Sequence, residues 1–312
     1  APAAWAELVG RFGRLKLTEV LAPAIEYAEA GFPVSPIISR QWAAGYKRFS
    51  VLKGSEFGCW LETFAPAGRA PLAGEIWRSP AHAHTLRRLA DSDCQDFYQG
   101  EIARRIDAFS RQYGGCLRAS DLAGYRPEWV EPISVNYRGH EVWELPPNGH
   151  GLVTLLALNI LQGMQFERKE SADTYHLHIE AIKLAFADGL KYIADPRRSN
   201  VPVKELLAEA YTASRRGLIG PKALQPTAGE PVKGGTVYLA TADGEGNMVS
   251  YIQSNYMGFG SGLVVPETGI ALHNRGCNFS LEPGHANALA PGKRPYHTII
   301  PGFLTKDGKA VG

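Results

Sequence analysis

The spacing of apolar residues changes once along the chain, close to residue 235, and this change limits the fold more than any other feature. Upstream, apolar residues recur at the three- to four-residue spacing of helices. The segments with this pattern are 17–32, 96–115 and 171–196, and a fourth, 152–164, is apolar on nearly every side, as in a buried helix. From Thr236 onward, apolar and polar residues alternate, which predicts strands. The sequence therefore predicts a mixed α/β chain.

Three further segments complete this scheme. Residues 129–151 alternate β-branched and aromatic side chains around Arg138 and Gly139, so they predict a hairpin. Residues 262–274 predict another strand-turn-strand unit. The stretch 217–235 has the glycine, proline and charge of an exposed linker. We therefore expect a helix-rich part over residues 1–235 and a strand-rich part over residues 236–312.

Composition and charge narrow the classes of function. The 312 residues are 45% hydrophobic and carry a net charge of +2 without a block of like charges, so neither nucleic acid nor a membrane surface is indicated as a partner. No apolar run is long enough to span a membrane. Residues 1–13 lack the features of a signal peptide, and both ends look interrupted. The compartment, bacterial-type cytoplasm or periplasm, therefore stays open.

Three groups of residues resemble binding motifs but lack the spacing that those motifs need. His176 and His178 lie two residues apart in a predicted helix, so they face different sides and do not form a zinc pair. The glycines of 258–262, GFGSG, precede a strand and lack the Lys-Ser/Thr ending of a phosphate loop, which favours a bulge or a close backbone approach to a ligand. The four cysteines lack the spacing of a zinc site.

Thr236 begins a predicted strand directly behind Gly234 and Gly235. Such a threonine is most often structural, but this arrangement also suits nucleophilic catalysis. A threonine hydroxyl needs an adjacent base to become a good nucleophile. If the Gly235–Thr236 bond is cut, the new α-amino group has a pKa of about 8 and lies in the same residue as the hydroxyl. Gly235 has no Cβ, which eases the strained geometry of hydroxyl attack on its carbonyl.

Several segments together resemble the γ-glutamyltransferases (glutathione hydrolases), a family of the N-terminal-nucleophile hydrolases. The resemblance to the small subunit lies in residues 236–280, which begin TVYLATADGEGNMVSYIQ, and in ALAPGKRPYHTIIP, residues 288–301. The resemblance to the family's large subunit lies in residues 6–36, 96–106, 120–151 and 172–196. The resemblance implies a four-layer αββα sandwich, with Thr236 at the start of a central strand, cut into a helical large subunit and a β-rich small subunit. It also implies sequence beyond both ends, including an arginine that binds substrate carboxylate and a Gly-Gly oxyanion hole.

The resemblance assigns the catalytic roles to three residues. Thr236 matches the threonine that cuts the precursor after Gly235 and then attacks the substrate. Ser254 matches a threonine whose hydroxyl assists that nucleophile, and the hydroxyl is retained. The family needs neither a metal nor an organic cofactor for this reaction, so none is expected here.

The substrate pocket departs from the family. Tyr256 stands where an asparagine often lies beside the substrate. Arg275 replaces a glutamine or glutamate and Asn278 replaces an aspartate, the pair that binds the α-ammonium of the γ-glutamyl group. His297 and Thr298 replace two serines that bind its α-carboxylate. All five are expected to line the substrate site.

These replacements alter the expected substrate. Loss of a carboxylate that faces an ammonium costs on the order of 2–5 kcal/mol, and Arg275 favours a carboxylate instead. We expect an amidohydrolase or acyltransferase that forms an acyl-enzyme on Thr236 from γ-glutamyl or related carboxy-acyl amides. One alternative is an acylase of the glutaryl, cephalosporin or oxamate type without true γ-glutamyl specificity. The other is an unprocessed, non-catalytic homologue.

The expected partners follow from this chemistry. They are a small amide substrate, water or an amine acceptor, and the chain's own large and small subunits after cleavage. Assembly of several copies into a homo-oligomer stays open, because nothing in the sequence bears on it.

Overall fold

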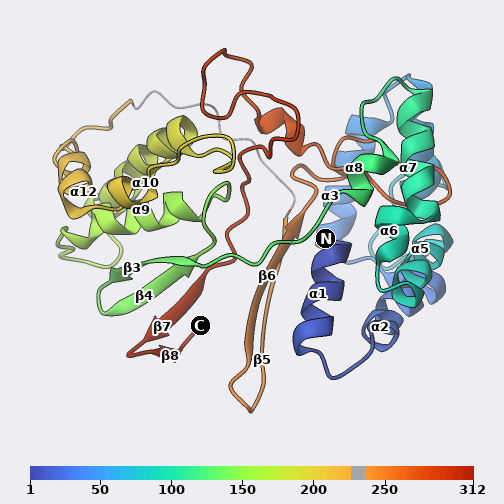
Figure 1. The fold of residues 1–312 in the computed structure, drawn as a ribbon, viewed down its shortest axis with the longest axis horizontal. Coiled ribbons are helices and arrows are strands. Elements are labelled where there is room, and N and C mark those ends of the chain that lie inside the picture. The colour runs from blue at the N-terminus through green and yellow to red at the C-terminus, as the bar shows by residue number, and fades with distance from the viewer. Residues whose placement is uncertain (226–235) are drawn as a thin grey trace. The chain divides into compact units, whose positions relative to one another are not determined.

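The computed structural model describes residues 1–225 and 236–312 (Figure 1). They form two compact units, each made of two stretches of chain. Unit 1 comprises residues 1–129 and 257–273, and unit 2 comprises residues 130–256 and 274–312. The mixed α/β class predicted from the sequence is confirmed. The predicted division at residue 235 concerns cleavage of the chain rather than compactness, and it stays a prediction.

Unit 1 is mainly helical. Its helices are α1 (Pro2–Phe12), α2 (Leu17–Ala30), α3 (Pro36–Phe49), α4 (Gly58–Phe64), α5 (Pro80–Asp91), α6 (Gln95–Gln99), α7 (Glu101–Gln112) and α8 (Ala119–Ala123), with a 3-10 turn at Ser55–Phe57 and a short ladder of β1 (Phe32–Pro33) with β2 (Ile76–Trp77). The predicted helix 17–32 is α2, which ends at Gly31 with a φ of 91°. The predicted helix 96–115 is divided at Gly100, the N-cap of α7, where the Asp96 carboxylate of α6 accepts the Glu101 N–H.

The segment 257–273 packs into the core of unit 1. The ring of Phe259 lies 5.2 Å from that of Trp60 and 5.0 Å from that of Phe64, between centroids. A Cβ on Gly260 would lie 2.3 Å from the Leu272 carbonyl oxygen, so the close approach found within 258–262 is to the protein's own backbone. The predicted approach to a ligand stays a prediction. The strand-turn-strand unit predicted for 262–274 is seen in part: its two arms pair antiparallel through one bridge between Val264 and Ala271 but form no regular strands. Glu267 and Gly269, which lie between the arms, have positive φ angles.

Unit 2 contains a four-stranded antiparallel sheet with the order β3-β4-β7-β8. Its strands are β3 (Ile133–Tyr137), β4 (His140–Glu144), β7 (Phe303–Lys306) and β8 (Lys309–Ala310). The hairpin predicted around Arg138 and Gly139 is confirmed as β3–β4. Both turn residues have positive φ, 53° and 84°, as a two-residue hairpin turn requires.

Four helices belong to unit 2: α9 (Gly151–Gln162), α10 (Ala172–Tyr192), α11 (Val203–Leu206) and α12 (Glu209–Arg216). Helix α9 lies between the strands β3 and β4 on one side and helices α10 and α12 on the other (Figure 1). Eight of its twelve residues are buried, which confirms the predicted buried helix. Helix α10 ends at Tyr192, before Pro196, because Ile193 is already extended.

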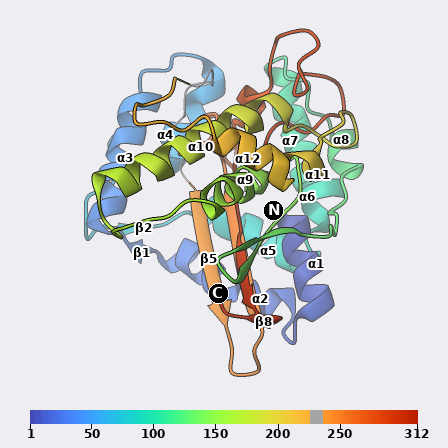
Figure 2. The same ribbon diagram turned by 90° about the vertical axis from the view of Figure 1, so that its left-hand side faces the viewer.

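A second hairpin of unit 2 pairs β5 (Thr236–Ala242) with β6 (Met248–Ser254) in antiparallel register, from Thr236 opposite Ser254 to Ala242 opposite Met248. The predicted strand over these residues is confirmed as β5, and the residues before Thr236 lie outside the described ones. The turn is held by the Asp243 carboxylate, which accepts the N–H groups of Glu245 and Asn247. Figure 2 shows the two strands side by side, with their turn away from the helices of this unit. All residues of β5 are exposed, and among the described strands it pairs with β6 alone, so the central position expected for it is not seen.

Candidate active site

The first residue of β5 and the last residue of β6 place two hydroxyl groups together. Thr236 lies opposite Ser254 in the ladder, and directly opposed residues project from the same face. The Thr236 hydroxyl donates to the Ser254 hydroxyl oxygen over 3.1 Å. Thr236 is exposed, so its hydroxyl is not part of a packed core. Gly235, the other predicted cleavage residue, lies outside the described residues.

A tight turn behind β6 orients the Ser254 side chain. Tyr256 has a φ of 75°, a left-handed conformation that few non-glycine residues adopt. This turn directs the Tyr256 N–H back to the Ser254 hydroxyl oxygen at 2.9 Å. Ser254 Oγ therefore accepts two hydrogen bonds, one from the backbone and one from Thr236, which fixes its position relative to the Thr236 hydroxyl.

The Arg275 guanidinium lies beside this pair and is almost fully buried, with 4% of the residue exposed. Arg275 begins a 3-10 turn, Arg275–Asn278. Its Nη1 donates to the Thr298 hydroxyl over 3.1 Å and its Nη2 donates to the Ser254 carbonyl over 3.5 Å. The guanidinium carbon is 5.2 Å from the centroid of the buried Tyr256 ring, in cation–π range. Burial lowers the pKa of Arg275, since a charge is less stable away from water.

Asn278 and His297 are tied to the backbone near this group. The Asn278 Nδ2 donates to the Tyr296 carbonyl over 2.9 Å, so the amide binds the wall of the site. The His297 N–H donates to the Asn148 carbonyl over 2.9 Å. Five predicted site residues are thus brought together by direct contacts. Asn278 and His297 lie near them because they are close in sequence to Arg275 and Thr298. The five are Thr236, Ser254, Tyr256, Arg275 and Thr298.

Sequence reasoning missed Asn287, which contacts two backbone segments of this wall. Its Nδ2 donates to the Asn278 carbonyl over 2.6 Å, and its Oδ1 accepts the Tyr296 N–H over 3.1 Å. The residue is 4% exposed. An asparagine between two alanines gives no sequence signal of burial, so only its partners identify it.

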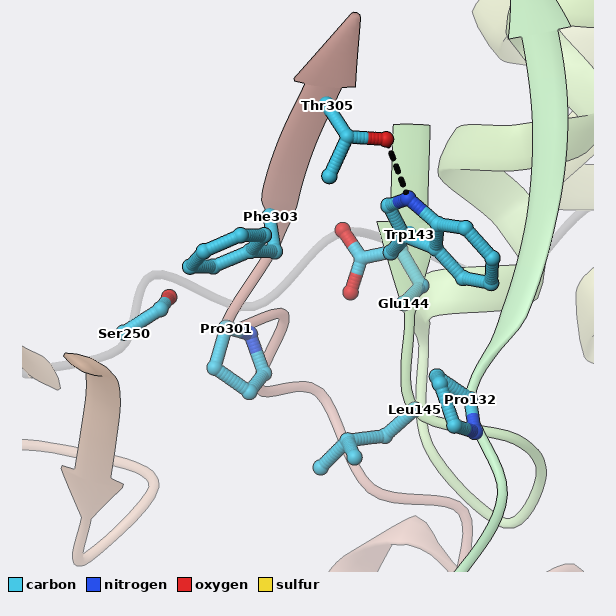
Figure 3. Close-up of a pocket in the computed structure, with 8 residues that line it drawn as sticks. All are labelled: Pro132, Trp143, Glu144, Leu145, Ser250, Pro301, Phe303 and Thr305. Carbon is cyan, nitrogen blue, oxygen red and sulfur yellow. Dashed lines mark hydrogen bonds between the residues drawn. The ribbon is translucent and has the colours of Figure 1, made fainter. Parts of the chain in front are cut away.

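A separate pocket of about 400 Å³ in unit 2 is lined by none of the predicted site residues. Figure 3 shows the Glu144 carboxylate between the rings of Trp143 and Phe303. Glu144 is 4% exposed, and burial raises its pKa to about 7. The one serine hydroxyl in the lining, that of Ser250, donates to the Gly302 carbonyl over 2.8 Å. This pocket therefore does not offer the hydroxyl pair found at Thr236.

The two histidines considered as metal ligands in the sequence have other contacts in the structure. The His176 imidazole contacts the Gly220 carbonyl at 2.7 Å, and the His178 ring packs 4.9 Å from that of Phe166. No group of three or more His, Cys, Asp or Glu side chains in residues 1–225 and 236–312 could hold a metal ion. Within the same residues, no helix has both the length and the apolar character to cross a membrane.

Comparison with known proteins identifies the family. Residues 1–312 match the γ-glutamyltranspeptidase family model, and the chain belongs to this family. It is 37% identical over 307 residues to the glutathione hydrolase-like YwrD proenzyme of Bacillus subtilis, covering 98% of this chain and 57% of that protein. It is also 37% identical over 306 residues to the oxamate amidohydrolase proenzyme of Klebsiella pneumoniae, with the same 98% and 57% coverage.

A solved structure gives the same answer for the fold. The cephalosporin acylase from Bacillus halodurans matches all of this chain and 58% of its own, with 58% sequence identity and a TM-score of 0.95. The predicted family and the N-terminal-nucleophile hydrolase fold are therefore confirmed. The chain spans a little more than half the length of these three proteins.

Proposed function

We propose that the protein is a self-cleaving N-terminal-threonine amidohydrolase or acyltransferase that acts on carboxy-acyl amides. The observation that carries the proposal is the hydroxyl pair of Thr236 and Ser254 at the start of β5, with Thr236 exposed. A nucleophile needs access to its substrate and a neighbour that fixes its orientation. Thr236 has both.

Self-cleavage is the first reaction. The Thr236 oxygen attacks the Gly235 carbonyl carbon, and the acyl group moves from nitrogen to oxygen to give an ester. Water hydrolyses this ester, which leaves a carboxylate on Gly235 and a free α-amine on Thr236. Ser254 Oγ holds the attacking hydroxyl in one orientation during the reaction.

Amide turnover uses the new amine. It accepts the hydroxyl proton of Thr236 while the oxygen attacks the substrate carbonyl, and the proton passes to the departing amine. The resulting acyl ester on Thr236 is resolved by water in hydrolysis or by an amine in transfer. The α-amine of an N-terminal residue has a pKa of about 8, so it is partly unprotonated and basic at neutral pH.

The proposed substrate class rests on Arg275. Its buried guanidinium contacts Thr298 and Ser254, which places a positive charge beside the nucleophile. A charge removed from water interacts strongly with a nearby ion, so a carboxylate on the acyl part is attracted and the α-ammonium of a γ-glutamyl group is repelled. One relative is named for oxamate, an amide whose acyl part carries a carboxylate, which is in line with this preference.

Two measurements on the full-length protein test the proposal. Intact-mass spectrometry should find two polypeptides that separate before Thr236, and one uncut polypeptide for Thr236→Ala. Glutaryl-anilide should then be hydrolysed with a higher kcat/KM than γ-glutamyl-anilide. The reverse preference would refute the substrate class. An uncut wild-type chain would support the alternative of a non-catalytic homologue, and cutting in Thr236→Ala would show that another residue is the nucleophile.

A further inference from the structure

Asn287 connects two segments of the site wall through a single side chain. It donates from Nδ2 to the Asn278 carbonyl over 2.6 Å and accepts at Oδ1 from the Tyr296 N–H over 3.1 Å. The Asn278 side chain completes a ring, because its Nδ2 donates to the Tyr296 carbonyl over 2.9 Å. Three hydrogen bonds therefore join the backbone at Asn278 to the backbone at Tyr296.

This ring fixes the spacing of the residues that flank it. Arg275 begins the 3-10 turn that ends at Asn278, and Thr298 follows two residues after Tyr296. The Nη1 of Arg275 donates to the Thr298 hydroxyl over 3.1 Å, so the two segments meet again at the functional groups. A planar amide with short bonds at both ends permits little change in separation.

We infer that Asn287 is a positioning residue that holds the Arg275–Thr298 pair at the spacing needed to receive the acyl carboxylate. This inference rests on the function proposed above. Asn287 lies 12 residues after Arg275 and 11 residues before Thr298. Its effect on substrate passes through the ring with Asn278 and Tyr296. It is therefore assigned a role in substrate binding and none in bond breaking.

The second segment has anchors of its own. Asn148 donates from Nδ2 to the Pro295 carbonyl over 2.6 Å and accepts the His297 N–H over 2.9 Å. Tyr296 is buried and belongs to the apolar core of unit 2. Loss of the Asn287 amide should therefore release Asn278 and the turn at Arg275, while residues 295–297 keep their place and the protein still folds.

Asn287→Ala in the full-length, self-cleaved enzyme is the first test. We expect the KM for glutaryl-anilide to rise about tenfold, as small displacements of binding groups weaken binding. The kcat and the rate of self-cleavage should change less than about twofold, because Thr236 and Ser254 are untouched. Asn159→Ala is the matched control: Asn159 Nδ2 donates to the Leu207 carbonyl over 3.0 Å, outside the site.

Asn287→Asp gives a second readout. An ionised carboxylate accepts the Tyr296 N–H but cannot donate to the Asn278 carbonyl, whereas a protonated carboxyl does both. The KM of Asn287→Asp relative to wild type should therefore fall as the pH is lowered. The same ratio for Asn287→Ala should not depend on pH.

The inference is overturned if Asn287→Ala has the KM of wild type, or if it loses kcat and self-cleavage in the same proportion as KM. Failure of this inference can be told apart from failure of the proposed function. A wild-type enzyme that hydrolyses γ-glutamyl-anilide and no carboxy-acyl amide would refute the substrate class. The KM of Asn287→Ala for γ-glutamyl-anilide would then test the positioning role, because the same wall faces that acyl group.

Discussion

The Thr236 hydroxyl is hydrogen-bonded to the Ser254 hydroxyl across the β5–β6 ladder, 18 residues away in sequence. The contact depends on the register of the hairpin. A shift by one residue would turn one of the two side chains to the opposite face. The turn at Asp243 fixes this register through its own hydrogen bonds, so a feature at one end of the hairpin sets the geometry at the other.

Ser254→Ala should slow both self-cleavage and amide turnover about fivefold. The variant loses a hydrogen bond that orients Thr236, and such a bond contributes about 1 kcal/mol. Ser254→Thr keeps the hydroxyl and should remain close to wild type. Ser250→Ala removes another β6 hydroxyl, bound to the Gly302 carbonyl, and serves as the control. A time course of cleavage on gels measures the effect, and a wild-type rate in Ser254→Ala would contradict the assigned role.

Arg275→Gln should lower kcat/KM for glutaryl-anilide by about 30-fold or more, the effect of removing one member of a desolvated charge pair. Discrimination against γ-glutamyl-anilide should weaken, because the cation that repels the α-ammonium is gone. Arg275→Lys keeps the charge without the planar fork and should fall between the two. Arg138→Gln removes a guanidinium at the β3–β4 turn and is the matched control. Unchanged selectivity in Arg275→Gln would exclude Arg275 from substrate recognition.

Asp195→Asn should destabilise the protein by about 2 kcal/mol near neutral pH. Asp195 is fully buried and accepts hydrogen bonds from the Arg197 side chain and the Arg294 N–H, which hold its pKa well below its usual range. A lowered pKa gives stability that is present above about pH 4 and is lost as the pH falls. The difference in the free energy of unfolding between variant and wild type, measured with urea, should therefore become smaller as the pH is lowered. A difference that is constant with pH would contradict this.

Glu144→Gln should have the opposite effect on the pH dependence of stability. Burial raises the pKa of Glu144 from 4.5 to about 7, so the folded state holds its proton more tightly than the unfolded chain. The contribution of Glu144 to the free energy of unfolding is then fully present below about pH 4.5. It is lost as the pH rises through about 7, by at most about 3 kcal/mol. Glu144→Gln should remove this decline and be more stable than wild type at pH 8. Parallel pH profiles of the free energy of unfolding would show that Glu144 does not titrate in this way.

Local patterns predicted the elements whose causes are local. The apolar run of α9, the turn at Arg138 and Gly139, and the strand beginning at Thr236 all depend on neighbouring residues. The family resemblance, rather than any pattern, supplied the candidate site, and contacts in the structure join five of its residues. Their catalytic and binding roles stay predictions.

Other features depend on distant contacts, and these were not predictable. The division of the chain into units is one, because residues 257–273 return to unit 1 through the packing of Phe259 on Trp60. The burial of Glu144 is another: it is packed against Gly151 and Gly302, where a Cβ would lie 2.8 and 3.0 Å from its carboxylate oxygens. The role of Asn287 depends on two backbone groups nine residues away on either side.

The exposed strand β5 has a practical consequence for anyone who prepares this segment by itself. Val237, Tyr238 and Leu239 are all more than two-fifths exposed, on consecutive positions and hence on both faces of the strand. An uncovered edge with apolar side chains is a template for strand pairing between molecules. Purified residues 1–312 should therefore self-associate at high concentration, and a partner strand that covers this edge should prevent the association.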